Sequence, residues 1–238
     1  MAEIFLSIVI PAFNEARRLP ATLRDIREKL KEADFIYEVI VVDDGSVDET
    51  RRIATETGRI FSNFKLIAND VNQGKGAAVR RGMLTARGRW RLFMDADNST
   101  AIGHFWEMQP FLESGYDIVF GSREVSGAVL NPPQPLLKVW AGDLGNFLMR
   151  LLGLTSFRDT QCGFKCFSDR ATGAIFPLAE INGWAFDLEI LFLGNKLGFK
   201  IKEIPVVWSN NADSRVKMRH YFSTLAEIGK IRRRFWKK

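Results

Sequence analysis

Two aspartates with one residue between them, Asp95 and Asp97, follow the apolar segment 90–94. Carboxylate oxygens bind hard divalent cations such as Mg²⁺ or Mn²⁺, and such ions also bridge to substrate phosphates. The spacing therefore predicts a metal site at this pair. The alternative is a pair of turn acids that cap the next helix, because Asp favours helix caps, and the motif alone fits both.

A second pair of acids, Asp43 and Asp44, follows the apolar segment 37–42. Adjacent carboxylates at this point could accept hydrogen bonds from a nucleobase and a ribose hydroxyl. A strand-ending turn, in which Gly45 supplies the unusual backbone dihedral angles, is the alternative interpretation.

Two further polar segments each leave two interpretations open. The first is Pro11-Ala12-Phe13-Asn14-Glu15. Here Glu15 could contact a nucleotide, or Asn14 could merely begin a helix. In the second, Lys75 and free backbone N–H groups at a helix start could hold anionic groups of a ligand. This segment, 72–76, has neither the Walker nor the dinucleotide-binding spacing, and a tight turn explains it equally well.

The elements that must position these residues alternate between strand and helix. Short apolar segments predict strands over residues 4–10, 37–42, 64–68, 90–94, 117–120 and 201–208, with Pro11 ending the first. Helical spacing predicts helices over residues 19–33, 48–57, 75–86, 105–112, 139–152, 170–176, 186–197 and 221–236. The pattern is typical of an α/β fold with a mainly parallel sheet flanked by helices.

Polar motifs follow four of the predicted strands, at residues 14–15, 43–44, 95–97 and 122–123. Ligands of parallel sheets bind beyond the carboxyl ends of the strands. We therefore expect these motifs to meet at one edge of the sheet, whereas residues 127–135, rich in proline, read as a loop.

Composition limits the classes of protein that this chain could be. The 238 residues are 46% hydrophobic and 26% charged, which fits a globular protein with a domain over 1–210 and a basic amphipathic C-terminal helix over 211–238. Much of the net charge of +6 lies in residues 230–238, so a broad nucleic-acid-binding face has little support. Two cysteines suit buried, reduced thiols of a cytoplasmic protein. We expect neither a signal peptide nor a membrane-spanning helix.

Taken together, the motifs resemble those of a known family. From Ile8 to Trp208 the chain is similar to the inverting glycosyltransferases of the GT-A fold (family 2-like), and especially to the dolichyl- and polyprenyl-phosphate β-glucosyltransferase branch. The early motifs described above are shared by many relatives. Two later ones are far more specific to this branch, and they are Asp159-Thr160-Gln161-Cys162-Gly163-Phe164-Lys165 and Trp184-Ala185-Phe186-Asp187.

The resemblance implies a role for each matching residue. Asp95 and Asp97 would serve the metal and the diphosphate, and Arg123 would lie near phosphates of the donor or acceptor. Other residues expected to bind the donor are Pro11, Ala12, Asn14, Glu15, Asp43, Asp44, Lys75 and Ala96. The acceptor and sugar pocket would comprise Arg123, Asp159, Gln161, Lys165, Trp184 and Asp187. A buried loop packed under the sheet is the alternative for the two late segments.

The resemblance further implies transfer of glucose from UDP-glucose to a polyprenyl phosphate with Mg²⁺ or Mn²⁺. Asp97, Arg123 and Asp187 would be the catalytic residues, with Asp187 as the first candidate base if the acceptor were a hydroxyl. Expected partners are the donor, the lipid acceptor and the cytoplasmic face of a membrane, where the protein would be peripheral; a membrane-protein subunit is a further candidate. The alternatives are a GDP-mannose donor, a sugar-hydroxyl acceptor, a non-catalytic nucleotide-sugar binder and, with least support, a nucleic-acid-binding protein.

Overall fold

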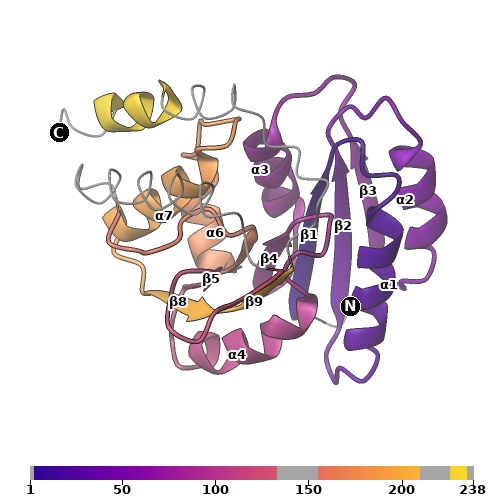
Figure 1. Ribbon diagram of the computed structural model, residues 1–238, viewed down its shortest axis with the longest axis horizontal. Helices are drawn as coiled ribbons and strands as arrows, with labels where there is room; N and C mark the ends of the chain where they lie inside the picture. The colour runs from indigo at the N-terminus through magenta and orange to yellow at the C-terminus, as the bar shows by residue number, and fades with distance from the viewer. Residues whose placement is uncertain (1–2, 133–154, 210–225, 235–238) are drawn as a thin grey trace.

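The computed structural model describes residues 3–132, 155–209 and 226–234. Its main feature is a seven-stranded sheet with the order β3-β2-β1-β4-β7-β5-β8 and with helices on both faces (Figure 1). The strands are β1 (Leu6–Ala12), β2 (Tyr37–Asp43), β3 (Phe64–Ala68), β4 (Trp90–Met94), β5 (Ile118–Ser122), β7 (Phe164–Ser168) and β8 (Ile201–Pro205). The helices are α1 (Leu19–Lys29), α2 (Thr50–Gly58), α3 (Lys75–Thr85), a 3₁₀ turn at Ile102–His104, α4 (Phe105–Glu113), α6 (Asp169–Ile175) and α7 (Phe186–Lys196).

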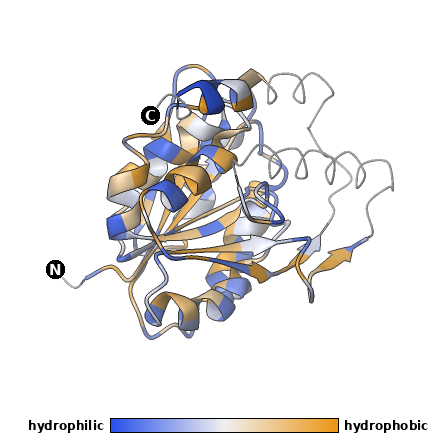
Figure 2. Ribbon diagram, turned by 90° about the vertical axis from the view of Figure 1, so that its left-hand side faces the viewer, coloured by the Kyte–Doolittle hydropathy of each residue, from blue (hydrophilic) through white to orange (hydrophobic). Residues whose placement is uncertain are grey.

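The sheet is buried on both faces, which explains why its strands are continuous apolar segments rather than alternating ones. One core, containing Ile8, Ile10 and Val41, packs under α1, α2 and α4. The other, containing Val9 and Val42, packs under α3, α6 and α7. In Figure 2 the strands are mostly orange to white, whereas the helices carry both orange and blue residues, as expected of helices with one face on the sheet.

The predicted mainly parallel sheet flanked by helices is confirmed. Strands β1 to β4 pair in parallel, and β5 pairs in parallel with β8. β7, which the sequence analysis did not predict, runs antiparallel between β4 and β5. It therefore joins the two parallel halves into one sheet.

The predicted bounds of the first strand, 4–10, were wrong: β1 spans Leu6–Ala12. β1 continues through Pro11 to Ala12, where it still pairs with β2. Its pairing with β4 covers only Leu6–Val9, so one side of the strand is unpaired at Pro11. A proline has no N–H to donate, and an unpaired side of a strand tolerates it.

The predicted strand 201–208 is two strands that lie in different sheets. The second, β9 (Val207–Ser209), pairs in parallel with β6 (Val129–Asn131), which lies within the segment predicted as a loop. The part of that loop after residue 132 lies outside the described residues.

The C-terminal part of the chain contributes one described helix, over residues 226–234. Its Ile231 is 1% exposed and belongs to the core under α7. The predicted helix over 139–152 and the remainder of 221–236 lie outside the described residues. Within the described ranges, no helix has the length and apolar character needed to cross a membrane.

Candidate active site

The four polar motifs meet at one edge of the sheet, as the sequence predicted. β1 ends at Ala12, β2 at Asp43, β4 at Met94 and β5 at Ser122, so the polar residues after them all follow carboxyl ends. These strands run in one direction, since β7 is antiparallel to both β4 and β5. The topology therefore brings together residues from distant parts of the sequence.

The Asp43–Asp44 pair joins the loops at this edge. The Asp44 carboxylate, 2% exposed, accepts hydrogen bonds from the backbone N–H groups of Gln73 (3.0 Å) and Gly74 (2.8 Å) and from the Asn69 amide (2.7 Å). Asp43 accepts a hydrogen bond from Arg51 Nε at 3.1 Å. Asp44 thereby fixes the loop that carries Lys75, a role that the sequence analysis did not foresee.

The loop after β1 is held by the loop after β2. Asn14 adopts a positive φ of 57°, its backbone N–H donates to Ser46 Oγ at 2.8 Å, and its Oδ1 accepts from the Val47 N–H at 2.9 Å. The Glu15 carboxylate accepts from Arg18 Nε at 2.7 Å. Asn14 is thus a turn residue in this structure, and Glu15 faces a cation.

Lys75 and Asp95 form an ion pair next to the metal motif. Lys75 Nζ lies 2.6 Å from Asp95 Oδ1, and the side chains are 17% and 33% exposed. Burial by itself would lower the pKa of Lys75, but the carboxylates of Asp95 and Asp187 outweigh burial and raise it. Trp184 covers this ammonium, with its ring centroid 5.3 Å from Nζ.

A glycine of the late motif makes room for Asp95. The Asp95 N–H donates to the Gly163 carbonyl at 3.1 Å, and a Cβ at Gly163 would lie 2.1 Å from Asp95 Oδ2. Any side chain at this position would therefore displace the carboxylate. The segment 159–165 accordingly packs directly against the metal motif.

Asp97 takes part in a turn and faces a cation. Its Oδ1 accepts a hydrogen bond from the Ser99 N–H at 3.0 Å, and its Oδ2 lies 3.7 Å from an Arg18 nitrogen. Its side chain is 24% exposed. Among the described residues no group of three or more His, Cys, Asp or Glu side chains could hold a metal by itself. Asp95 and Asp97 fit a Mg²⁺-type site only where substrate phosphates complete the coordination, which is the usual arrangement for that ion.

Arg123 is held in one orientation. Its Nε and one terminal nitrogen donate to the two Asp159 oxygens at 2.7 and 2.9 Å, and its backbone N–H also donates to Asp159 at 2.9 Å. Burial would lower the pKa of Arg123, but the Asp159 carboxylate outweighs burial and raises it. Burial would raise the pKa of Asp159, but the Arg123 guanidinium outweighs burial and lowers it. Gln161 donates its N–H to Asp159 at 3.0 Å.

Two residues that sequence reasoning missed support this pair. Glu203 on β8 accepts hydrogen bonds from the backbone N–H groups of Arg158 (3.1 Å) and Asp159 (2.8 Å). The Trp208 ring lies 5.6 Å from the Arg123 guanidinium carbon. A lone acid within the apolar segment 201–208 was the only signal for Glu203, and the sequence carried none for the Trp208 contact.

Lys165 and Asp187 form a fully enclosed ion pair. Their N–O distance is 2.5 Å, and the two residues are 0% and 1% exposed. Burial raises the pKa of Asp187, against the opposing charges of Lys165 and Lys75. Because Asp187 already pairs with a buried cation, this arrangement suits positioning better than proton abstraction from a bound hydroxyl.

The two cysteines are unpaired and buried, as predicted, and burial raises the pKa of the Cys162 thiol to about 12. Burial raises the pKa of the Cys166 thiol as well. Both are therefore poor nucleophiles at neutral pH, because the thiolate is the reactive form.

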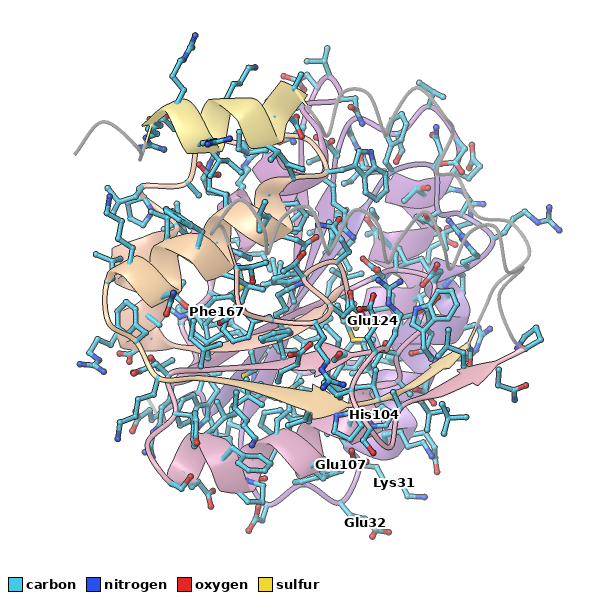
Figure 3. All side chains as sticks on the ribbon, turned by 60° about the vertical axis from the view of Figure 1, so that its left-hand side comes forward. Lys31, Glu32, His104, Glu107, Glu124 and Phe167 are labelled. Atoms are coloured by element: carbon cyan, nitrogen blue, oxygen red, sulfur yellow. The ribbon has the colours of Figure 1, made fainter. Side chains whose placement is uncertain are left out.

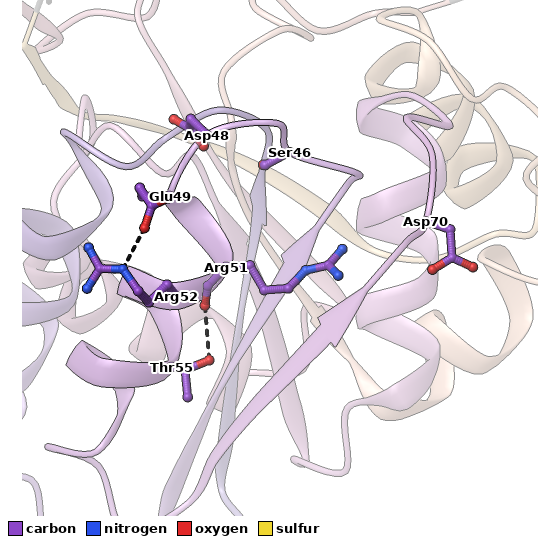
Figure 4. A pocket seen from close by; sticks show the side chains of 7 residues that line it. All are labelled: Ser46, Asp48, Glu49, Arg51, Arg52, Thr55 and Asp70. Carbon is purple, nitrogen blue, oxygen red and sulfur yellow. Dashed lines mark hydrogen bonds and ion pairs between the residues drawn. The ribbon is translucent and has the colours of Figure 1, made fainter.

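Two surface hollows lie outside the predicted site. The first hollow has a volume of 520 Å³ and lies beside α2 (Figure 4). Its lining residues are Ser46, Asp48, Glu49, Arg51, Arg52, Thr55 and Asp70. Arg51 also donates a hydrogen bond to Asp43. The second, of 650 Å³, lies between α4 and β8 and is lined in part by Glu107, which Figure 3 shows near His104. His104 Nε2 accepts a hydrogen bond from the Val207 N–H at 3.1 Å, so His104 anchors β9. No predicted site residue lines either hollow.

The sequence matches the family model described as "Glycosyl transferase family 2" over residues 7–176. This chain belongs to glycosyl transferase family 2. The match spans most of the chain, from β1 through α6, and includes every motif at the sheet edge.

The curated relatives of this family 2 enzyme include dolichyl-phosphate β-glucosyltransferases. It is 34% identical to "Dolichyl-phosphate beta-glucosyltransferase ALG5A" of Trichomonas vaginalis, over 97% of this chain and 73% of the relative. It is 36% identical to the dolichyl-phosphate β-glucosyltransferase of Dictyostelium discoideum, over 90% of this chain and 69% of the relative. The chain is therefore a glycosyltransferase, as predicted.

Solved structures show that this transferase has the GT-A fold, also as predicted. The structure is similar to that of glucosyl-3-phosphoglycerate synthase from Mycobacterium tuberculosis, which was solved with Mn²⁺, UDP and glucosyl-3-phosphoglycerate. The TM-score is 0.70 and the identity 19%, over 96% of this chain and 78% of that one. At this identity the likeness concerns the fold.

Proposed function

We propose that this transferase moves glucose from UDP-glucose to a polyprenyl phosphate, with inversion at the anomeric carbon and with Mg²⁺ or Mn²⁺ as cofactor. One observation carries the proposal. The two late motifs, which distinguish this branch of the family, converge on the donor motifs: Gly163 packs against Asp95, and Trp184 covers Lys75. The names of the relatives at 34% and 36% identity support the transfer of a glucosyl group to a dolichyl-type phosphate.

At the donor end, Asp95 and Asp97 would hold the divalent ion. When bound, the ion supplies positive charge that stabilises the departing UDP. The chain adds its own cations, because Lys75 and Arg18 lie next to these two aspartates. The raised pKa of Lys75 keeps its ammonium charged at neutral pH, so that Lys75 can donate hydrogen bonds to a phosphate oxygen.

At the acceptor end, no strong protein base is required. A phosphate monoester has a second pKa of about 6, so its oxygen is already largely anionic near neutral pH. That oxygen forms a bond to the anomeric carbon while the bond from this carbon to UDP breaks, and UDP leaves with the electron pair. Arg123, held by Asp159, could fix the orientation of the acceptor phosphate. The enclosed Lys165–Asp187 pair agrees with a reaction that needs no carboxylate base.

The test of this function is the transfer of radiolabel from UDP-glucose into a lipid extract that contains polyprenyl phosphate. We expect a labelled lipid that is stable to mild alkali and whose formation stops when EDTA removes divalent ions. Formation of labelled product only with a sugar acceptor would favour a hydroxyl acceptor. Nucleotide-sugar binding without any transfer would favour a non-catalytic regulator.

The donor base can be tested without an acceptor. We expect UDP with Mn²⁺ or Mg²⁺ to raise the melting temperature of the protein, and GDP to raise it much less. A ligand at 100 times its dissociation constant adds about 2.7 kcal/mol to the free energy of unfolding, which is readily detected. Thermal shifts with UDP, GDP and the metal alone provide the comparison. A larger response to GDP would move the assignment to GDP-mannose.

We also propose that the segment 211–238 brings the enzyme to a membrane surface, while the domain over 1–210 carries the site. In helix 226–234, Lys230, Arg232 and Arg233 are exposed, whereas Ile231 is buried against the domain. Arg234, in contrast, forms ion pairs with Glu180 at 2.9 Å and with Glu189 at 3.3 Å. The surface-facing charges in the described helix are therefore the first three.

Reversal of these three charges, Lys230→Glu, Arg232→Glu and Arg233→Glu, is expected to abolish sedimentation with anionic liposomes. Each cation near an anionic surface contributes about 1 kcal/mol, and salt weakens this attraction. The matched control reverses Arg24, Lys29 and Lys65, which are exposed on other elements, and should leave binding intact. Equal binding of the wild type to neutral and anionic vesicles would contradict the surface role without affecting the catalytic proposal.

A further inference from the structure

The helix over residues 226–234 (yellow in Figure 1) is fastened to the segment 178–185, which leads into α7. At one end of the helix, Arg234 donates to the Leu178 carbonyl at 2.9 Å and forms the ion pair with Glu180. At the other end, the Ala185 N–H donates to Glu227 Oε2 at 3.0 Å. The segment is thus held at both ends.

The Glu227 side chain contacts the backbone of the segment at Gly183 and Ala185. A Cβ at Gly183 would lie 2.1 Å from Glu227 Oε1, so the carboxylate lies where any other residue would place its side chain. The Glu227 carboxylate therefore contacts the backbone on both sides of Trp184, through a hydrogen bond at Ala185 and by packing at Gly183. Glu227 itself is only partly exposed.

The opposite side of the segment packs against the start of α3. The Asn182 carbonyl accepts a hydrogen bond from the Gly76 N–H at 2.8 Å, and a Cβ at Gly74 would lie 2.3 Å from the same oxygen. Arg80 donates to the Ala179 carbonyl and to Asn182 Oδ1, both at 2.9 Å. The segment is therefore enclosed between the loop that carries Lys75 and the C-terminal helix.

These contacts form a continuous path to the candidate active site. The carboxylate of Glu227 accepts a hydrogen bond from the N–H of Ala185, which follows Trp184, and packs against Gly183, which precedes it. The Trp184 ring lies over Lys75 Nζ, and Lys75 pairs with Asp95 at 2.6 Å. Displacement of the Trp184 backbone would remove the ring from Lys75 and let water reach the Lys75–Asp95 ion pair, which weakens their attraction.

We propose that Glu227 is a positioning residue for donor binding: from the C-terminal helix, it holds Trp184 over Lys75 and so completes one wall of the donor site. The inference rests on the proposed function, because it assumes that the site binds a nucleoside-diphosphate sugar. The helix proposed to approach the membrane would then also be part of the catalytic domain's binding wall.

The test compares Glu227→Ala and Glu227→Gln with Gly229→Ala. Gly229 is an exposed residue of the same helix, and a Cβ there would meet no atom within 4 Å, which makes it a matched control. We expect Glu227→Ala to raise the Kd for UDP with Mn²⁺ and the KM for UDP-glucose roughly 10-fold, as loss of one hydrogen bond to a charged group does. The turnover number should change little. Glu227→Gln keeps an oxygen that can accept from Ala185 and should restore most of the affinity.

Hydrogen exchange of the protein without ligand provides a second readout. Peptides that cover residues 178–186 should exchange faster in Glu227→Ala, and at the wild-type rate in Gly229→Ala. Faster exchange with unchanged donor affinity would overturn the inference, because the contact would then only stabilise the helix. Unchanged exchange would also overturn it.

Two further outcomes have defined meanings. Should Glu227→Ala fail to fold, Gly183→Ala disturbs the same contact from the segment, and unchanged donor affinity in that variant would contradict the proposal. If the wild type binds neither UDP nor GDP, the proposed function fails; the exchange data then decide separately whether Glu227 holds the segment.

Discussion

Replacement of Asp97 by alanine is expected to lower turnover at least about 100-fold, the usual cost of removing one group that stabilises transition-state charge. Asp95→Ala should have an effect of similar size, because it also removes the partner of Lys75. Asp97 is partly exposed and follows a strand end, so Asp97→Ala should change the free energy of unfolding little. Asp95→Ala should lower it more, because the mostly buried Lys75 then lacks this partner. Turnover at several Mg²⁺ and Mn²⁺ concentrations, together with melting temperature, measures the two effects separately.

The control for these variants is Asp34→Ala. Asp34 is an exposed aspartate before the amino end of β2, and therefore at the opposite edge of the sheet. Its removal changes the net charge equally but should leave turnover and metal dependence at wild-type values. Near-wild-type activity of either Asp95→Ala or Asp97→Ala would show that the metal role is wrongly assigned.

The largest effect on stability is expected from Asp187→Ala. The change leaves the Lys165 ammonium enclosed without its partner, and loss of one member of a buried ion pair costs about 3–5 kcal/mol. Lys165→Met should destabilise the protein to a similar extent. The double variant Lys165→Met/Asp187→Leu should recover most of the loss, because apolar residues of similar volume often replace a buried pair at little cost. Urea unfolding of the single and double variants gives the coupling between the two residues.

The pH dependence of Lys165→Met provides an independent check. Burial already raises the pKa of Asp187, and removal of the Lys165 ammonium should raise it further. The folded state then binds a proton more tightly than the unfolded state does. The stability of this variant should therefore increase as pH falls from neutral toward the ordinary pKa of aspartate, and decrease as pH rises through the folded-state pKa. Single variants whose stability is near wild type at all pH values would contradict the enclosed pair.

Local sequence was sufficient for the strands of the parallel sheet. The structure has β3 and β4 at the predicted boundaries, Phe64–Ala68 and Trp90–Met94. Each is a short apolar segment between polar turns, and burial on both faces requires that pattern whatever the strand's neighbours are. The same rule, with the preference for parallel crossovers, placed the polar motifs at one edge of the sheet.

Local sequence was not sufficient for β7. Phe164–Ser168 is buried throughout, but its first two residues also belong to the motif over residues 159–165, whose polar residues indicate a site rather than a strand. Nothing within five residues reveals that a strand will insert between β4 and β5 in the antiparallel direction. That outcome depends on pairing partners that are distant along the chain.

The sequence by itself determined that this protein has an α/β sheet with acids at its ligand-binding edge, because residue type and spacing are local properties that follow from burial and strand direction. Only the tertiary structure decided which charges pair. Lys165 and Asp187 are 22 residues apart, and Arg123 and Asp159 are 36 apart. Glu203, 44 residues after Asp159, accepts a hydrogen bond from its backbone N–H. A charged side chain needs a partner once the surrounding elements exclude water from it. The fold, rather than the residues next to it in the sequence, determines which partner lies within reach.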